Sequence, residues 1–99
     1  MRLIELEPRW LSSNLLAFKC PHCQNFWLTC KDVTLSSQEQ FDLYEKSFGE
    51  DWNMLVVPCR EEFCWRFSSS DFNSMSITPS IDASNSGHWH GSIVNGEAI

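Results

Sequence analysis

Short apolar runs and short alternating runs make up most of the pattern of hydrophobic and polar residues along this chain. The opening segment, Arg2–Leu6, alternates apolar and polar residues, which favours an initial strand. Two apolar-rich runs follow, Asn14–Cys20 and Asn25–Cys30, and they predict strands that enter and leave the tight turn between them. The N-terminal third therefore indicates a small β structure.

One segment has the periodicity of a helix. Ser36 and Glu39 have the spacing of a capping box, and the glycine after residue 48 can end a helix in the left-handed conformation. These signals predict a helix over residues 37–48. Three aromatic residues recur there at helical spacing: Phe41, Tyr44 and Phe48. We expect this stripe to be buried for packing and not to bind a cofactor.

The C-terminal half returns to short strand patterns separated by turns. Met54–Pro58 and Phe63–Phe67 are short apolar runs that predict buried strands, and Ser74–Ser80 alternates as a half-exposed strand does. Residues 82–87 (DASNSG) are typical of a loop. The dipeptide Asn95-Gly96 is a preferred pair for a type I′ turn, so it predicts a C-terminal hairpin.

Length and composition fit one globular domain. The 99 residues leave no room for separate catalytic and binding domains, and a chain that is 42% hydrophobic and 20% charged is expected to fold. We predict a single domain over residues 1–99 of the α+β class, rich in strands. It should combine small antiparallel sheets and a zinc knuckle with one inserted helix (about 37–48) and the hairpin. A metal would strengthen a core of this size.

Charge and hydropathy exclude several classes of partner. The net charge is −6, and the seven Lys and Arg residues are scattered without a basic stripe, which argues against nucleic-acid binding. Glu5 and Glu7 stand where a signal peptide needs an unbroken apolar segment, and no apolar run approaches the ~18 residues that span a bilayer. We therefore expect a cytoplasmic protein with neither a nucleic-acid nor a membrane partner.

The five cysteines are the first candidates for chemistry. In a reducing compartment they are metal ligands, reactive thiols or buried apolar residues rather than disulfides. The motif CPHC is the strongest signal, because a CxxC turn lets the thiolates of Cys20 and Cys23 converge on one tetrahedral metal ion. A redox dithiol and two incidental cysteines are the alternatives, but a thioredoxin-type motif would open a helix, and strands flank this one. We predict zinc, with His22 as a solvent-facing spacer.

A zinc ion needs further ligands, and spacing alone leaves two candidate pairs near parity. Cys59 and Cys64 have a spacing that a second knuckle allows. His88 and His90 lie two residues apart, so on a strand both imidazoles would face one ion, and the glycines on either side would let the backbone come close. The alternative for the two thiols is ordinary core burial. For the histidines it is a solvated loop end, with Trp89 as a buried anchor.

Both ends of the chain resemble a known family. The stretches “MRLIELEPRW” and “ITPSIDASNSGHWHGSIVNGE”, with a CPxC-type turn near residue 20, are similar to a family of small proteins of tailed phages and prophages. The chain also resembles a broader bacterial group of domains of unknown function, with a Cys-rich turn, a “TLSPS”-like strand and a final hairpin that carries a histidine. Some members of that group are encoded beside ubiquitin-like conjugation proteins. Residues 31–60 match poorly.

The resemblance selects among the candidate ligands. The matching polar positions are Cys20, Cys23, His88 and His90. His90 matches the single histidine of the broader group, whereas the other three cysteines lie outside the pattern. The resemblance thus implies a Cys2His2 zinc site that joins both ends of the sequence. Whether Cys59 and Cys64 replace or supplement the histidines stays open.

Two classes of function follow from such a site. Four protein ligands leave no open coordination position, so the zinc would be structural. The protein, with exposed-looking Trp10, Trp52 and Trp89, would then be an interaction module whose partner is a host or phage protein in the host bacterial cytoplasm. The alternative, a zinc-dependent hydrolase of the peptidase or isopeptidase type, needs an open metal position and a general base. Asp82 is the candidate base, or else a turn-forming residue. The sequence favours the first, non-catalytic class.

Overall fold

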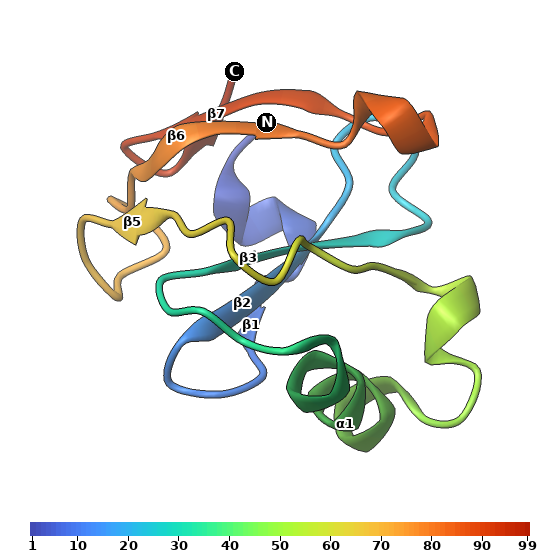
Figure 1. The fold of residues 1–99 in the computed structure, drawn as a ribbon. Coiled ribbons are helices and arrows are strands. Elements are labelled where there is room, and N and C mark those ends of the chain that lie inside the picture. The colour runs from blue at the N-terminus through green and yellow to red at the C-terminus, as the bar shows by residue number, and fades with distance from the viewer.

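The computed structural model describes residues 1–99 as three layers: two four-stranded sheets and one helix (Figure 1). The first sheet has the order β1-β2-β3-β4, with strands at Arg9–Trp10, Leu15–Lys19, Trp27–Lys31 and Val56–Val57. The second has the order β5-β6-β7-β8, with strands at Arg66–Phe67, Ile77–Asp82, His90–Val94 and Glu97–Ala98. All neighbouring strands are antiparallel except β3 and β4. The predicted strand-rich α+β class is confirmed.

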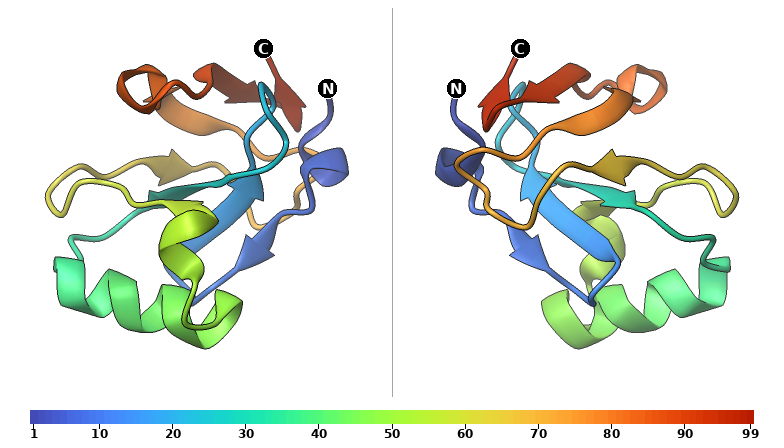
Figure 2. Two further views of the ribbon diagram at one scale, coloured as in Figure 1. Left: turned by 90° about the vertical axis from the view of Figure 1, so that its right-hand side faces the viewer. Right: turned by 90° about the vertical axis from the view of Figure 1, so that its left-hand side faces the viewer.

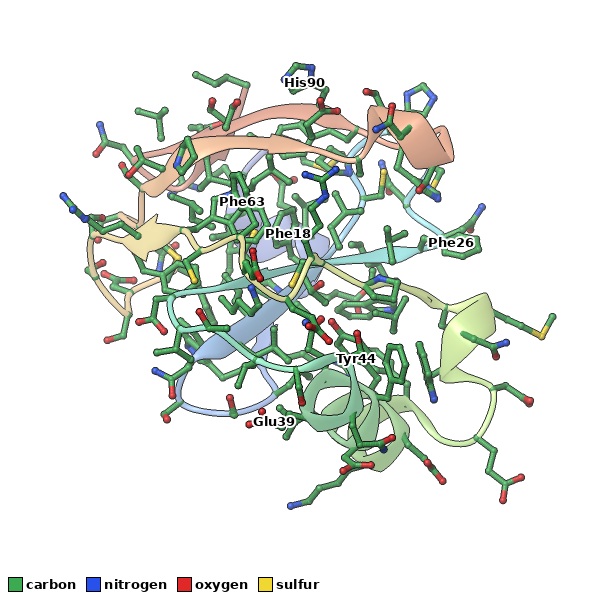
Figure 3. All side chains as sticks on the ribbon, viewed as in Figure 1. Phe18, Phe26, Glu39, Tyr44, Phe63 and His90 are labelled. Carbon is green, nitrogen blue, oxygen red and sulfur yellow. The ribbon has the colours of Figure 1, made fainter.

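The first sheet is the middle layer, and its strands β2 and β3 are buried on both faces. Phe18 and Leu28 belong to the larger core, which also contains side chains from the second sheet. Leu15 and Ala17 belong to a second core that includes Tyr44 of the helix. Figure 3 shows Phe18 and Tyr44 on opposite sides of the first sheet. Burial on both faces explains why these strands have continuous apolar runs instead of alternation.

The helix α1, Ser37–Phe48, begins and ends where the sequence predicts. The Ser36 hydroxyl accepts a hydrogen bond from the Glu39 N–H (3.1 Å), and the Glu39 carboxylate accepts one from the Ser36 N–H (3.2 Å). This reciprocal pair is the predicted capping box. Tyr44 is fully buried, and Phe41 and Phe48 pack beside it, so the aromatic stripe serves packing as expected.

The prediction of a strand at Arg2–Leu6 is wrong. The segment forms a short 3-10 helix, η1, over Leu3–Leu6, and only Arg2 makes an isolated bridge, with Glu97. A 3-10 helix has three residues per turn, so the buried Leu3 and Leu6 lie on one face of it. The three-residue spacing of the two buried leucines therefore fits a 3-10 helix and not a strand.

The remaining elements follow the predicted order with shifted bounds. A 3-10 turn, η2, covers Trp52–Met54, and β4 and β5 occupy only parts of the apolar runs that predicted them, while β6 extends past Ser80. Asn95 (φ 48°) and Gly96 (φ 76°) are both left-handed between β7 and β8, as a type I′ hairpin requires. The two ends of the chain lie side by side (Figure 2), where the Ala98 N–H donates to the Met1 carbonyl (2.8 Å). None of the helices has the length and apolar character needed to cross a membrane.

Candidate metal centre

Three of the four predicted ligands lie together. The ligand atoms of Cys20, Cys23 and His88 are all within 4.8 Å of one another. The two cysteines lie in the turn between β2 and β3 of the first sheet, and the histidine lies in the connection between β6 and β7 of the second. In Figures 1 and 2 the β2–β3 turn reaches up to the level of the second sheet. The group therefore joins the two sheets at one edge.

The CPHC turn is closed by backbone hydrogen bonds at its base. The Cys20 N–H donates to the Phe26 carbonyl (2.7 Å), and the Gln24 N–H donates to the Cys20 carbonyl (2.7 Å). Burial opposes ionisation of the Cys23 thiol, but hydrogen bonds from the backbone of Asn25 and Phe26 and from Cys20 outweigh it and lower the pKa of Cys23. Because the thiolate is the form of cysteine that binds a metal ion, the lowered pKa favours Cys23 as a metal ligand.

His88 is held with one ring nitrogen toward the thiols. It follows the 3-10 turn η3 (Ser84–Ser86), and its N–H donates to the Ala83 carbonyl (3.0 Å). Its Nδ1 lies 3.5 Å from the Cys23 Sγ. The Phe26 ring packs against the imidazole, with centroids 4.9 Å apart. This packing partner could not be found from the sequence, because no spacing distinguishes Phe26 from other apolar strand residues.

The fourth predicted ligand, His90, is placed elsewhere. It is the first residue of β7, so His88 lies outside the strand and the rule that alternate strand residues share a face does not apply. His90 is exposed, pairs in register with Asp82, and points outward from β7 (Figure 3). The structure does not bring His90 into the three-residue group, and its role as a ligand stays a prediction.

The residues between and beside the histidines serve packing. Trp89 is half-buried rather than buried, and it packs against the larger core with its ring edge-on to Phe18 at a centroid distance of 6.4 Å. A Cβ at Gly91 would lie 2.4 Å from the Trp89 ring and 2.4 Å from the Ile99 carbonyl oxygen. Gly91 thus makes room for an indole, whereas its expected close approach to a metal ion stays a prediction.

The other cysteines lie outside this group. The Cys59 thiol donates to the Gln40 side chain (3.5 Å), and the Cys64 thiol donates to a backbone carbonyl (3.8 Å). Neither belongs to a cluster of three or more metal-ligating groups. Burial raises the pKa of both Cys30 and Cys59. Cys30 is fully buried, whereas Cys59 and Cys64, the two thiols for which core burial is the alternative, are only half-buried. His22 is exposed, as a spacer should be.

Asp82 has the turn-forming role. Its Oδ1 accepts hydrogen bonds from the Ser84 hydroxyl (2.6 Å) and the Ser84 N–H (2.9 Å), and these bonds lower the pKa of Asp82. A carboxylate with a lowered pKa is a weaker general base. Three pockets of about 370, 470 and 340 Å³ are not lined by any residue of the candidate metal centre.

Two thiols and one imidazole form a donor set that suits zinc, for which structural sites are tetrahedral with sulfur and nitrogen ligands. The group can hold a metal ion with three protein ligands and leaves one coordination position for a fourth. No protein-family model matches the chain, and neither a curated protein nor a solved structure is significantly similar to it.

Proposed function

We propose that the protein binds zinc through Cys20, Cys23 and His88, and that the ion is structural. The observation that carries this proposal is the convergence of three ligand atoms within 4.8 Å, although 65 positions separate Cys23 from His88 in sequence. Such an ion fastens the β2–β3 turn to the β6–β7 connection. It joins two sheets that share one small core.

Two observations support a structural ion over the hydrolase alternative. None of the three pockets described above is lined by a candidate ligand, so none of these three places a substrate beside the metal. The candidate base, Asp82, is engaged by Ser84 in its own turn. A hydrolytic site needs both an accessible metal and a free base within hydrogen-bond reach of the attacking water.

The module that this ion stabilises is proposed to act by binding a protein of the host or the phage, in the host bacterial cytoplasm. The tryptophans that suggested this role from the sequence are half-buried and packed. Trp10 contacts Phe67 at 5.2 Å, and Trp52 contacts Phe41 at 4.8 Å, both as centroid distances. The binding surface is therefore proposed elsewhere, as argued below.

Metal analysis of the purified chain tests the zinc proposal. We expect a stoichiometric zinc ion that is lost in Cys20→Ala and His88→Ala and retained in Cys59→Ala. Cobalt substitution tests whether His90 occupies the fourth coordination position of the metal. If His90→Ala has an unchanged cobalt spectrum, an external ligand occupies that position. Stoichiometric zinc in His88→Ala together with its loss in Cys59→Ala would overturn the assignment.

A further inference from the structure

A pocket of about 370 Å³ lies between the two sheets and shares no residue with the candidate metal centre. Its volume falls within the range of ligand sites, about 300–1,000 Å³. Leu28, which is 2% exposed, and Val57 of the edge strand β4 line its apolar part. Phe63 and Trp65 form an aromatic wall with ring centroids 4.6 Å apart. In Figure 3, Phe63 lies between the levels of β6 and β3.

The charges around this pocket are mostly negative. Asp82 and Arg60 line it, and Arg60 also lines the neighbouring depression together with Glu61 and Glu62. The Lys31 ammonium group, which donates to the Phe63 carbonyl behind the aromatic wall, adds a second cation, so three carboxylates against two cations leave a net charge of −1, on a chain whose total is −6. None of these five charged residues takes part in an ion pair.

We infer that this pocket docks a basic segment of a partner protein. The segment inserts an aromatic or aliphatic side chain against Leu28 and Val57 and places a Lys or Arg beside Asp82. An apolar floor inside a polar rim is the arrangement in which a single inserted side chain contributes most to binding. The negative rim steers a cation toward the pocket, and the aromatic wall offers it a ring face. The inference rests on the proposed role as a protein-interaction module.

The wall of the pocket is coupled to the candidate metal centre. Ala83 and Ser86 line the pocket. The Ala83 carbonyl accepts hydrogen bonds from both the Ser86 N–H (3.1 Å) and the His88 N–H (3.0 Å). An ion that holds His88 therefore also holds this wall, so peptide binding should be tighter in the zinc-loaded protein than in the chelated protein.

Titration of the isotope-labelled, zinc-loaded full chain with two synthetic peptides tests the docking. The probes are acetylated and amidated Gly-Lys-Phe-Lys-Gly and its charge-reversed counterpart Gly-Glu-Phe-Glu-Gly. The main reporter is the indole N–H of Trp65, which donates to the Ser80 carbonyl (3.4 Å) between two residues of the pocket wall. We expect a saturable NMR shift of this signal and of the Ala83 amide with the lysine peptide. The glutamate peptide should bind at least several-fold more weakly.

Two variants separate the contribution of the Asp82 charge to peptide binding from the contribution of the open space in the pocket. Asp82→Asn keeps a side-chain oxygen for Ser84 while removing the charge, so it should weaken binding of the lysine peptide about two- to fivefold at low ionic strength. The difference should shrink as salt is added. Asp71→Asn is the matched control, because Asp71 is exposed, accepts the Asn73 N–H (2.9 Å) in a similar turn and lines none of the three pockets. Ser86→Trp should fill the pocket and abolish binding.

The docking is refuted if both peptides bind equally well, if the shifts map outside the pocket, or if neither peptide shifts the zinc-loaded protein. Asp82→Asn and the peptide pair keep the test decisive should Ser86→Trp fail to fold. Zinc content measured on the same samples separates the two proposals. Bound zinc without peptide binding refutes the docking alone, whereas a folded protein that never holds zinc refutes the proposed metal centre.

Discussion

Replacing His88 with alanine should remove most of the stability that the metal contributes. The variant removes the only one of the three candidate ligands that comes from the second sheet, so the ion and the connection that it makes between the two sheets are lost together. Unlike a chelator, which acts on the metal in solution, the substitution changes only this one ligand and leaves both thiols in place. The loss should therefore report the long-range link itself.

The size of the loss follows from the separation of the linked residues. A cross-link across the 65 positions between Cys23 and His88 removes unfolded-chain entropy worth about 4 kcal/mol at 25 °C in the chain-entropy treatment. The free energy of unfolding of a small domain is only about 5–15 kcal/mol. A loss of this size corresponds to a fall in Tm of roughly 15–30 °C for a chain of this length.

Urea unfolding followed by tryptophan fluorescence measures this loss for wild type and His88→Ala, each with zinc and with a chelator. The two proteins should differ by about 4 kcal/mol with zinc, and with the chelator only by the lost contact between the imidazole and Phe26. The exposed His90→Ala is the control and should change the stability by less than about 0.5 kcal/mol. The reasoning fails if the His88→Ala difference is the same with and without metal. It also fails if His90→Ala costs as much, which would instead indicate the closed Cys2His2 site.

Three further predictions concern the core and the helix. Because burial raises the pKa of Cys30 and Cys59, the unfolded chain loses these protons first. Stability should therefore fall above pH ~8.5 by at most about 1.4 kcal/mol per pH unit for each thiol, until the pH passes the pKa of that thiol in the folded protein. Urea titrations across that range test this, and an unchanged slope in Cys59→Ala would contradict it. Gly91→Ala should destabilise the fold by roughly 1–3 kcal/mol, because its methyl group overlaps Trp89, and an unaltered urea midpoint would count against that packing. Ser36→Ala should cost about 1 kcal/mol by removing the helix cap, measured in the same way.

The elements that could be predicted from the sequence are those whose geometry is set by near neighbours. The capping box joins Ser36 to Glu39, three residues away, and the type I′ turn needs only Asn95 and Gly96. The N-terminal segment could not be predicted, because five residues do not distinguish a repeat of two from a repeat of three. Its conformation depends on burial of Leu3 and Leu6 in a core built largely from distant strands.

The candidate site likewise has one part that could be predicted from the sequence and one part that could not. The CxxC spacing identifies Cys20 and Cys23, since the turn that brings them together is local. The choice between His88 and His90 depends on where β7 begins. The start of β7 in turn follows from the Ala83–Ser86 turn and from the burial of the intervening indole. No spacing rule contains that information.

The position of the candidate metal centre suggests why a metal would be used there. At the chain ends, the backbone of η1, which precedes the first sheet, is hydrogen-bonded to the hairpin of the second sheet, where the Leu3 N–H donates to the Gly96 carbonyl (2.7 Å). At the β2–β3 turn, the described contact with the β6–β7 connection is made by side chains, namely Cys23 and Phe26 against His88. Half-buried side chains alone hold such a corner weakly, because they remove little apolar surface from water. A metal ion supplies there the fixed geometry that hydrogen bonds supply at the other end. The same ion would then hold the pocket wall that the proposed partner contacts.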